Sequence, residues 1–592
     1  MIDGIAPRLR TVTVTDVERS VDRFLPGLRV ARAYRRDWIR PDLVAGVVLV
    51  ALLVPQGMAY AELAGLPPVT GLYATVLALL AYALVGPSRI LILGPDSALA
   101  PMVFAAVVPL VASGASPADR VTLAAMLAIL MGLICFAAGV FRFGVLAELL
   151  SMPMRIGYLN GLAVVILVSQ LPKLFGFSTH ADGVVNQLRA FADGVRDGQT
   201  NTTALAIGGA CLVTIMGLRR FAPRVPGMLI AVVGATLAVG LFDLTARGVA
   251  VVGAIPQGLP TPAWPGVSAS DAWSLLVAGV GMAFITIADT VAMSRTFAAR
   301  DDPVDENQEI AALGIANVAA GLFQGFPVSA SASRTAVASD NGAKSQLTGI
   351  VGAAGILVLL VAWSDATQNL PVASLSAIVI AASLALFDVR ELVRLARVRR
   401  SEFLLAMATA AGVVFVGVLQ GIAIAAALSL ANFVRRAWRP YNVALGRIEG
   451  RKGYHDVARH PEAAQIPGLV LFRFDAPLFF ANAEYFVNRV HELVTARGEP
   501  VHRVIVAAEP ISDIDTTAAE ALDVLVDDLH RRGIDLVFAE LKGPVKDRLD
   551  RYGLAEKIGD HGFPPTLGTA IDDYVEHTGV DWLDWEDRPP TP

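Results

Sequence analysis

The chain is poor in charged residues and in cysteine. Of its 592 residues only 17% are charged, whereas 55% are hydrophobic and the mean hydropathy is +0.57. Soluble domains carry about 25% charged residues. This composition therefore excludes an ordinary soluble enzyme and indicates a protein that crosses a membrane several times. Both cysteines, Cys135 and Cys211, lie in apolar stretches, which argues against a disulfide framework or a thiolate metal site.

Other familiar signals are missing as well. No Walker A sequence is present, so we expect no ATP-driven transport, and nothing indicates an enzyme or a cofactor. Seven of the eight histidines follow Tyr454 at spacings typical of a solvated surface, so we expect no metal site. Residues 1–42 are polar and arginine-rich rather than a cleavable signal peptide, and are expected to form a cytoplasmic N-terminal segment.

The apolar stretches predict a polytopic α-helical membrane domain over residues 43–439. A spanning helix needs about 20 apolar residues, and interrupted spans can be shorter. Fourteen stretches meet this description. They are residues 43–62, 69–85, 95–110, 121–140, 154–174, 202–218, 227–242, 273–293, 308–324, 328–338, 345–363, 372–387, 402–419 and 421–434.

The third and tenth of these stretches are interrupted in the same way, at residues 94–101 and 326–335, by proline and small residues. Such a pair predicts a seven-plus-seven inverted repeat with a binding site near the membrane midplane, where half-helix N-termini attract an anion. Asp96 and Arg334 lie inside the two interruptions, and charge at that depth is usually functional. The alternative is that these residues only kink packed helices.

Basic residues favour one side of this arrangement. They gather in the connections that are internal if the N-terminus is cytoplasmic, for example around residues 35–40, 219–224, 390–400 and 435–439. The positive-inside rule then places both termini in the cytoplasm and suits a bacterial inner membrane. It also explains the basic residues without a nucleic-acid partner.

The composition changes after Arg439. Residues 469–474, 504–508 and 535–539 are typical of buried strands, and apolar residues at helical spacing lie between them, in 486–494 and 518–529. This alternation predicts a cytoplasmic α/β domain over residues 440–576. The acidic tail, residues 577–592, is expected to be flexible or loosely docked.

Several long motifs in this order resemble the SulP family of anion transporters with a C-terminal STAS domain. In the apolar part these are residues 54–61, 64–73, 86–89 with Gly94-Pro95, 307–317 and 331–337. In the α/β part they are residues 477–484 and 513–517.

The resemblance implies core and gate domains, a homodimer and elevator-like alternating access, with the anion between the third and tenth spans. It assigns Asp289, in the eighth span, to cation coupling. The positions that it assigns to the substrate are Gln56, Tyr60, Asp96, Ser97, Ala98, Ser333 and Arg334.

Three positions depart from the family pattern. Asp96 stands where many members have an uncharged residue, so it could pair with Arg334, hold a cation or be protonated. Gln56 cannot titrate, whereas some proton-coupled relatives have an acid there. Met293, one turn beyond Asp289, replaces the hydroxyl of sodium-coupled relatives and favours H⁺ over Na⁺.

Thr516 corresponds to the phosphorylated position of some soluble STAS proteins. Because Ala518 replaces the usual following glycine, we expect Thr516 to be a helix cap rather than a phosphosite.

These observations predict a secondary active transporter of a small inorganic anion, with sulfate as first choice and H⁺ or Na⁺ symported through Asp289 and Asp96. Bicarbonate or a C4-dicarboxylate are the alternatives within the family. A regulatory scaffold with uncoupled anion conductance, whose STAS domain binds a protein such as acyl carrier protein, is the alternative outside it. Membrane lipid is a further expected partner.

Overall fold

A computed structural model describes residues 25–111, 116–143, 151–179, 181, 183–222, 225–259, 261–298, 304–582, 584 and 585. The predicted N-terminal segment up to residue 24 and the tail from residue 586 lie outside the described residues. The chain divides into two compact units, Met1–Ser429 and Leu430–Pro592. The division falls inside helix α18 (Val418–Trp438) rather than after it.

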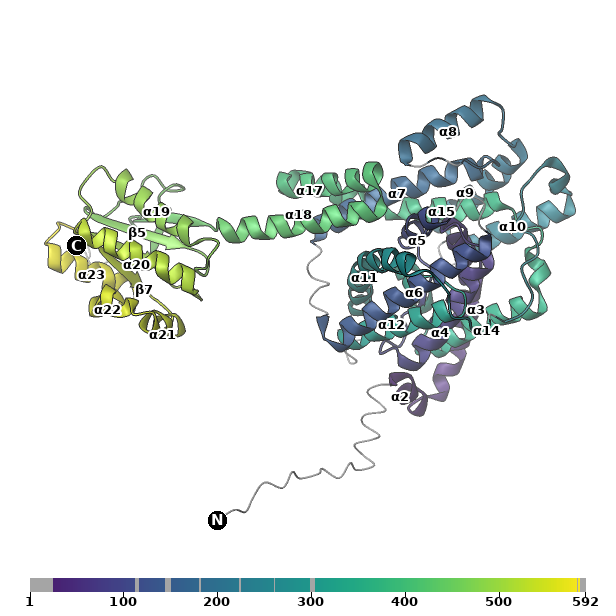
Figure 1. Cartoon of the computed structure of the whole chain (residues 1–592), viewed down its shortest axis with the longest axis horizontal. Coiled ribbons are helices and arrows are strands. Elements are labelled where there is room, and N and C mark those ends of the chain that lie inside the picture. Colours follow the sequence, from purple (N-terminus) through teal and green to yellow (C-terminus); the bar gives the residue numbers. More distant parts are fainter. Residues whose placement is uncertain are drawn as a thin grey trace, which may run out of the picture. The chain divides into compact units, whose positions relative to one another are not determined.

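The first unit is helical, and its helices pack in two groups (Figure 1). One group holds the two interrupted segments and is called here the half-helix group. Its members are α3 (Ile39–Leu63), α4 (Pro68–Val85), α5 (Ala100–Val107), α6 (Pro117–Val140), α11 (Ala269–Phe297), α12 (Glu306–Leu322), α13 (Ala332–Asp340) and α14 (Leu347–Ala362).

The second group is built around α7 and is called here the α7 group. It consists of α7 (Met152–Leu174), α9 (Thr202–Phe221), α10 (Gly227–Leu241), α15 (Val372–Leu386), α16 (Val389–Val398) and α17 (Arg400–Ala411). The two groups meet where α3 packs on α10 and α15.

Each of the fourteen predicted stretches overlaps a helix, and the last one lies within α18. Within the described residues, eight helical stretches of at least 18 residues are apolar enough to cross a membrane. Three shorter apolar ones are Ala100–Leu110, Gly227–Leu241 and Leu347–Ala362. The unit is therefore a helical membrane protein, whereas the count of fourteen crossings stays a prediction.

Polar residues at the expected positions begin several helices. Asn201 accepts hydrogen bonds from the N–H groups of Thr203 and Ala204 at the start of α9, and Asp305 does the same for α12. Ser116 and Asp119 form a capping box at the start of α6. These side chains satisfy N–H groups that have no partner inside the helix.

Glycines bring α6 and α12 close together. A Cβ added at Gly132 would lie 2.7 Å from the carbonyl oxygen of Gly314, and one at Gly314 would lie 2.6 Å from that of Gly132. Gly139 and Gly321 make equally close approaches to the opposite helix two turns away. Small residues at such intervals are the usual way for membrane helices to gain van der Waals contact.

Both interrupted segments contain a short strand, and the two strands pair with each other. β1 (Leu93–Gly94) runs antiparallel to β2 (Ser329–Ala330), with Leu93 opposite Ala330 and Gly94 opposite Ser329. Two further bonds extend the pairing, from the N–H of Ser331 to the carbonyl of Ile92 (3.2 Å) and from the N–H of Ile92 to Thr335 Oγ1 (3.1 Å). The half-helices follow these strands in the chain, α13 one residue after β2 and α5 after the turn at residues 95–99.

Asp42 joins the start of α3 to the connection between α13 and α14. It is fully buried and accepts hydrogen bonds from the backbone N–H groups of Lys344 (2.6 Å) and Ser345 (3.1 Å), and from the hydroxyls of Ser345 and Thr348. The Tyr34 hydroxyl donates a further bond at 2.9 Å. Burial, followed by the contact with Asp42, raises the pKa of Tyr34 to about 12.

The second unit is a five-stranded mixed sheet in the order β4-β3-β5-β6-β7. The strands are β3 (Asn442–Arg447), β4 (Tyr454–Asp456), β5 (Leu469–Phe474), β6 (Arg503–Ala507) and β7 (Asp535–Ala539). β5, β6 and β7 are parallel, and β3 is antiparallel to β4 and β5. The three predicted strands are thus confirmed within one residue, whereas β3 and β4 were not predicted.

Helices cover both faces of the sheet, because successive residues of a strand point to opposite sides. Val470, Phe472 and Phe474 of β5 pack against α19 (Ala483–Ala496) and α20 (Thr516–Arg531), which carry the predicted apolar faces. α21 (Gly543–Arg551) and α22 (Leu554–Ile558) complete that side. Leu469 and Leu471 face α23 (Leu567–Thr578) on the other side.

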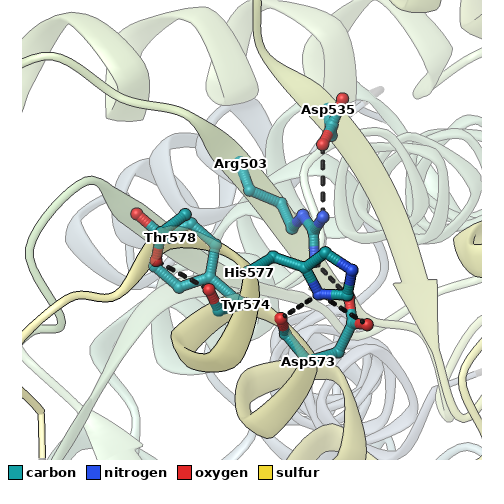
Figure 2. A network of polar contacts seen from close by, with 6 residues as sticks. All are labelled: Arg503, Asp535, Asp573, Tyr574, His577 and Thr578. Carbon is teal, nitrogen blue, oxygen red and sulfur yellow. Dashed lines mark hydrogen bonds and ion pairs between the residues drawn. The ribbon is translucent and has the colours of Figure 1, made fainter.

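A polar network fixes α23 to the sheet (Figure 2). Arg503, at the start of β6, forms ion pairs with Asp573 of α23 (2.6 Å) and with Asp535 of β7 (3.3 Å). Its guanidinium also lies over the ring of Tyr574, 5.7 Å from the centroid. His577 Nδ1 lies 2.8 Å from the Asp573 carbonyl oxygen.

The described part of the acidic tail is docked on the same unit. Asp584 forms an ion pair with Arg447 of β3 at 2.7 Å, and the Arg447 guanidinium lies over the Trp585 ring. Trp582 packs against the core beside α23. Of the two expected alternatives, flexible or docked, this segment adopts the docked one.

The predicted connections contain structure that the hydropathy pattern missed. The connection between the predicted stretches 154–174 and 202–218 holds the amphipathic helix α8 (Val184–Arg196), and the basic connection after residue 387 forms α16. α17 continues into a π-helical turn, Gly412–Val416, which ends at Gly417. Before α3 lies α2 (Pro26–Arg32).

Replacing Asp42 by Asn tests how much its hydrogen bonds to the connection between α13 and α14 stabilise the protein. Asp42→Asn should lower the free energy of unfolding by about 3 kcal/mol. The Asn side chain has one oxygen in place of two, so some of the buried N–H and O–H donors around it would lose their hydrogen-bond acceptor. The midpoint of thermal denaturation in detergent measures the change. Asp37→Asn is the control, since Asp37 forms an exposed ion pair with Arg35 (2.9 Å) worth less than about 1 kcal/mol. Equal midpoints for the two variants would contradict this role.

Candidate functional site

The N-terminus of α13 is open toward solvent. Its N-cap residue, Ser331, makes no side-chain capping bond, and the following residues Ala332 and Ser333 are exposed. Ser331 Oγ lies 3.2 Å from Ser333 Oγ. The first N–H groups of a helix lack partners within it and carry the positive end of its dipole. This end of α13 is therefore suited to an anion.

Arg334 is buried beside this helix end with spare hydrogen-bond donors. Its side chain is 1% exposed, and Nη2 donates to the carbonyl oxygen of Gly94 at 3.1 Å. Among the described residues, Nε and Nη1 have no hydrogen-bond partner. A buried cation with unfilled donors is costly. An anion accepting from these atoms would remove that cost.

Glycine is required opposite Arg334. A Cβ at Gly94 would overlap Nη1 of Arg334, and the other atoms near it also belong to the guanidinium. Gly94 thus leaves room for the arginine to reach the β1 backbone. Gly94 therefore both pairs with β2 and determines where the Arg334 guanidinium lies.

Asp96 occupies the corresponding end of the other half-helix. Its Oδ1 accepts from the N–H of Ala98 at 2.9 Å, and its carbonyl accepts from the N–H of Ala100 at 3.0 Å, where α5 begins. Ser97 and Ala98 are buried behind it. The charge of Asp96 acts on Arg334. The hydrogen bonds of Asp96 lie in and just after the turn that precedes α5. The N-cap residues of both half-helices, Leu99 of α5 and Ser331 of α13, make no side-chain capping bond.

The two predicted residues of α3 lie one helical turn apart, but their contacts differ. Tyr60 is 5% exposed and faces Ser97, within the fields of Asp96 and Arg334. Gln56 is 2% exposed, and its Nε2 donates to Met228 Sδ of α10 at 3.4 Å. The structure thus brings Tyr60 to the half-helix ends, while Gln56 contacts the α7 group.

Asp289 of α11 has a partner that was not predicted. Its Oδ1 lies 2.9 Å from Nη2 of Arg155 on α7, and the side chains are 17% and 38% exposed, respectively. Asp96 is the other acid whose charge acts on Asp289. Arg155 lies inside the predicted span 154–174, so the rule that charge within an apolar span is functional would have found it.

In the described residues, no group of three or more His, Cys, Asp or Glu side chains could hold a metal ion. Any cation at Asp289 would thus have few protein carboxylates around it. This bears on the choice between a proton and Na⁺, because hard cations take several oxygen ligands.

The expectation that Thr516 is a helix cap is wrong. The N-cap of α20 is Asp515, whose side chain accepts from the N–H of Ala518 at 2.8 Å. Thr516 is the first residue of the helix and is exposed, with Oγ1 3.4 Å from the Tyr552 hydroxyl. An ionised carboxylate caps more strongly than a hydroxyl and is favoured by the helix dipole.

Two interrupted helices that end at a buried arginine define a membrane transporter built on broken helices. Profile comparison agrees: the Sulfate permease family matches residues 39–409 and the STAS domain matches residues 460–570. The chain belongs to the sulfate permease (SulP/SLC26) family of anion transporters and carries a C-terminal STAS domain.

Curated relatives are similar over nearly the whole chain. A "Probable sulfate transporter" of Mycobacterium tuberculosis (strain ATCC 25618 / H37Rv) is 42% identical over 549 residues, which cover 93% of this chain and 97% of the relative. "Sulfate transporter 4.1, chloroplastic" of Arabidopsis thaliana is 30% identical over 587 residues, covering 95% and 84%.

Solved structures share the fold. The murine solute carrier 26 family member A9 anion transporter, in the inward-facing state, gives a TM-score of 0.86 at 24% identity and covers 96% of each chain. The transmembrane domain of the cyanobacterial bicarbonate transporter BicA gives 0.57 at 21% identity, covering 67% of this chain and 97% of that one.

Substitution of Gly94 tests the position of Arg334. Gly94→Ala should displace the guanidinium and weaken binding of a test anion, sulfate, at least about tenfold if the anion binds at Arg334, since it disturbs a charge-assisted contact. Isothermal titration of the purified protein measures this affinity. Gly281→Ala on α11 is the control, because a Cβ there meets no atom within 4 Å. Unchanged affinity in Gly94→Ala would refute the placement.

Proposed function

We propose that the protein is a secondary active transporter of sulfate. The observation that carries the proposal is the buried Arg334 with two donors free, next to the uncapped and exposed start of α13. Sulfate offers four oxygen acceptors around one centre, so it can accept from the guanidinium and from helix N–H groups together. The names of the bacterial and plant relatives support the same substrate.

The tetrahedral dianion suits the charges of the site. Arg334 supplies one positive charge and the helix end about half of another. The negative charge of Asp96 opposes these positive charges, but its carboxylate accepts a hydrogen bond from the Ala98 N–H. In this proposal Tyr60, Ser97, Ala98 and Ser333 complete the anion site, and Gln56 contributes from one turn away on α3.

Asp289 is the proposed coupling residue, and H⁺ the preferred coupling ion. A proton needs only a single carboxylate, whereas Na⁺ needs several oxygen ligands. Met293, one turn further along α11, supplies none. Asp96 remains a second candidate for the coupling proton.

The larger arrangement is also proposed. It has fourteen membrane crossings arranged as an inverted repeat, which would account for the paired interruptions, and both termini in the cytoplasm. Transport would take place by an elevator-like movement of the half-helix group against the α7 group. Location in a bacterial inner membrane and a homodimer follow from the family resemblance. Phosphorylation of Thr516 and binding of acyl carrier protein by the STAS domain are open regulatory hypotheses.

Uptake of radiolabelled sulfate into proteoliposomes, with and without pH and Na⁺ gradients, tests the function. Saturable uptake stimulated by an inward proton gradient is expected. Competition by bicarbonate or fumarate distinguishes the alternative substrates. If no anion shows saturable uptake, the transporter proposal fails and the scaffold hypothesis gains support.

Arg334→Gln should abolish saturable sulfate uptake, with a loss of about 100-fold or more, because truncating a buried charge-assisted contact typically costs several kcal/mol. Gel filtration and circular dichroism verify folding. Arg394→Gln is the control, since Arg394 is exposed and forms its ion pair with Glu391 of its own helix. Sulfate affinity equal to wild type in Arg334→Gln would exclude Arg334 from the site.

Asp289→Asn should abolish proton-driven accumulation while leaving sulfate counterflow largely intact. The reason is that an amide cannot take up a proton, although it keeps the shape of the side chain. Both activities are measured in the same proteoliposomes. Equal loss of accumulation and counterflow would argue against coupling at this residue.

A further inference from the structure

Helix α7 carries a basic residue near each end, and each is paired with an acid of the half-helix group. Arg155 Nη2 lies 2.9 Å from Asp289 Oδ1 on α11, and Lys173 Nζ lies 3.0 Å from Glu62 Oε1 on α3. The two basic residues are about 27 Å apart along the helix axis. Because α7 packs on α9, α15 and α17, both ion pairs cross from one helix group to the other.

The two ion pairs have different relations to the candidate site. Within the described residues, the groups whose charges act on Asp289 are Arg155 and Asp96, and the Tyr158 hydroxyl of α7 also faces it. Asp289 therefore connects the half-helix end, through Asp96, with the other helix group, through Arg155. Glu62 is the last residue but one of α3 and follows Tyr60 by two residues, which places the two side chains on different faces of the helix.

We propose that Arg155 is the positioning residue through which Asp289 controls the contact between the two helix groups. While Asp289 is ionised, its carboxylate holds the guanidinium and so links α7 to α11. When Asp289 takes up a proton from water, the charge-assisted contact is lost and the groups can separate. This inference rests on the proposed proton coupling, and it adds the route from proton uptake to helix movement.

The exposure of the pair makes such an exchange feasible. Arg155 is 38% and Asp289 17% exposed at the side chain, so water can reach the carboxylate and solvate the released guanidinium. A fully buried pair would leave an unpaired charge after protonation, at a much higher cost. Partly exposed pairs are also weak enough to open and close reversibly.

Distance measurement between spin labels tests this inference without any substrate. Met152→Cys on α7 and Thr296→Cys on α11 place labels at exposed positions, after the buried Cys135 and Cys211 are replaced by Ala. In proteoliposomes, the labelled protein should gain a longer-distance population at mildly acidic pH. The expected change in the population ratio is about two- to fivefold.

Variants of the pair separate the possible causes. Arg155→Gln and Asp289→Asn should each show the longer distances at both pH values, and the double variant should add nothing further. Arg155→Lys keeps the charge and should keep the pH response. Lys173→Gln is the matched control, because it removes the other ion pair of the same helix and should leave the response unchanged.

Two results would overturn the inference: a normal acid response in Arg155→Gln, or additive effects of Arg155→Gln and Asp289→Asn. A pH response with no uptake of any anion would defeat the proposed function but retain the connection between Asp289 and α7. Proton-coupled uptake with no pH-dependent change in distance would retain the proposed function but exclude the connection between Asp289 and α7.

Discussion

The pairing of two short strands inside the apolar unit is the constraint on which the candidate site depends. A helix that is interrupted within a membrane leaves N–H and C=O groups without partners, and lipid cannot satisfy them. Here β1 and β2 satisfy each other, and Ser331 and Thr335 extend their pairing to Ile92. Because the strands fix where α5 and α13 begin, they also fix the site between the half-helices.

The same pairing explains how opposite charges coexist at the centre. Gly94 lets the guanidinium of Arg334 reach the β1 backbone, and Asp96 lies two residues further on. A carboxylate near an anion site should be unfavourable. Here Asp96 accepts a hydrogen bond from the N–H of Ala98, in the turn before α5, and its charge interacts with that of Arg334.

Charge pairs also connect the two helix groups. Arg155 and Lys173 of α7 each meet an acid of the half-helix group. Both pairs are partly exposed, so they favour one relative position of the groups without locking it. In the proposed mechanism, the charge state of Asp289 affects both ion coupling and the relative position of the helices.

The sequence by itself determined the apolar spans, the two interruptions, the sheet strands β5 to β7 and the residue types of the site. These features follow from local composition and periodicity, which a single segment expresses without its neighbours. Only the tertiary structure decided the register of β1 on β2, the partner of Arg155, and which predicted residues meet at the half-helix ends. Those contacts join residues more than 100 positions apart, and local patterns carry no information on which distant segments will pack together.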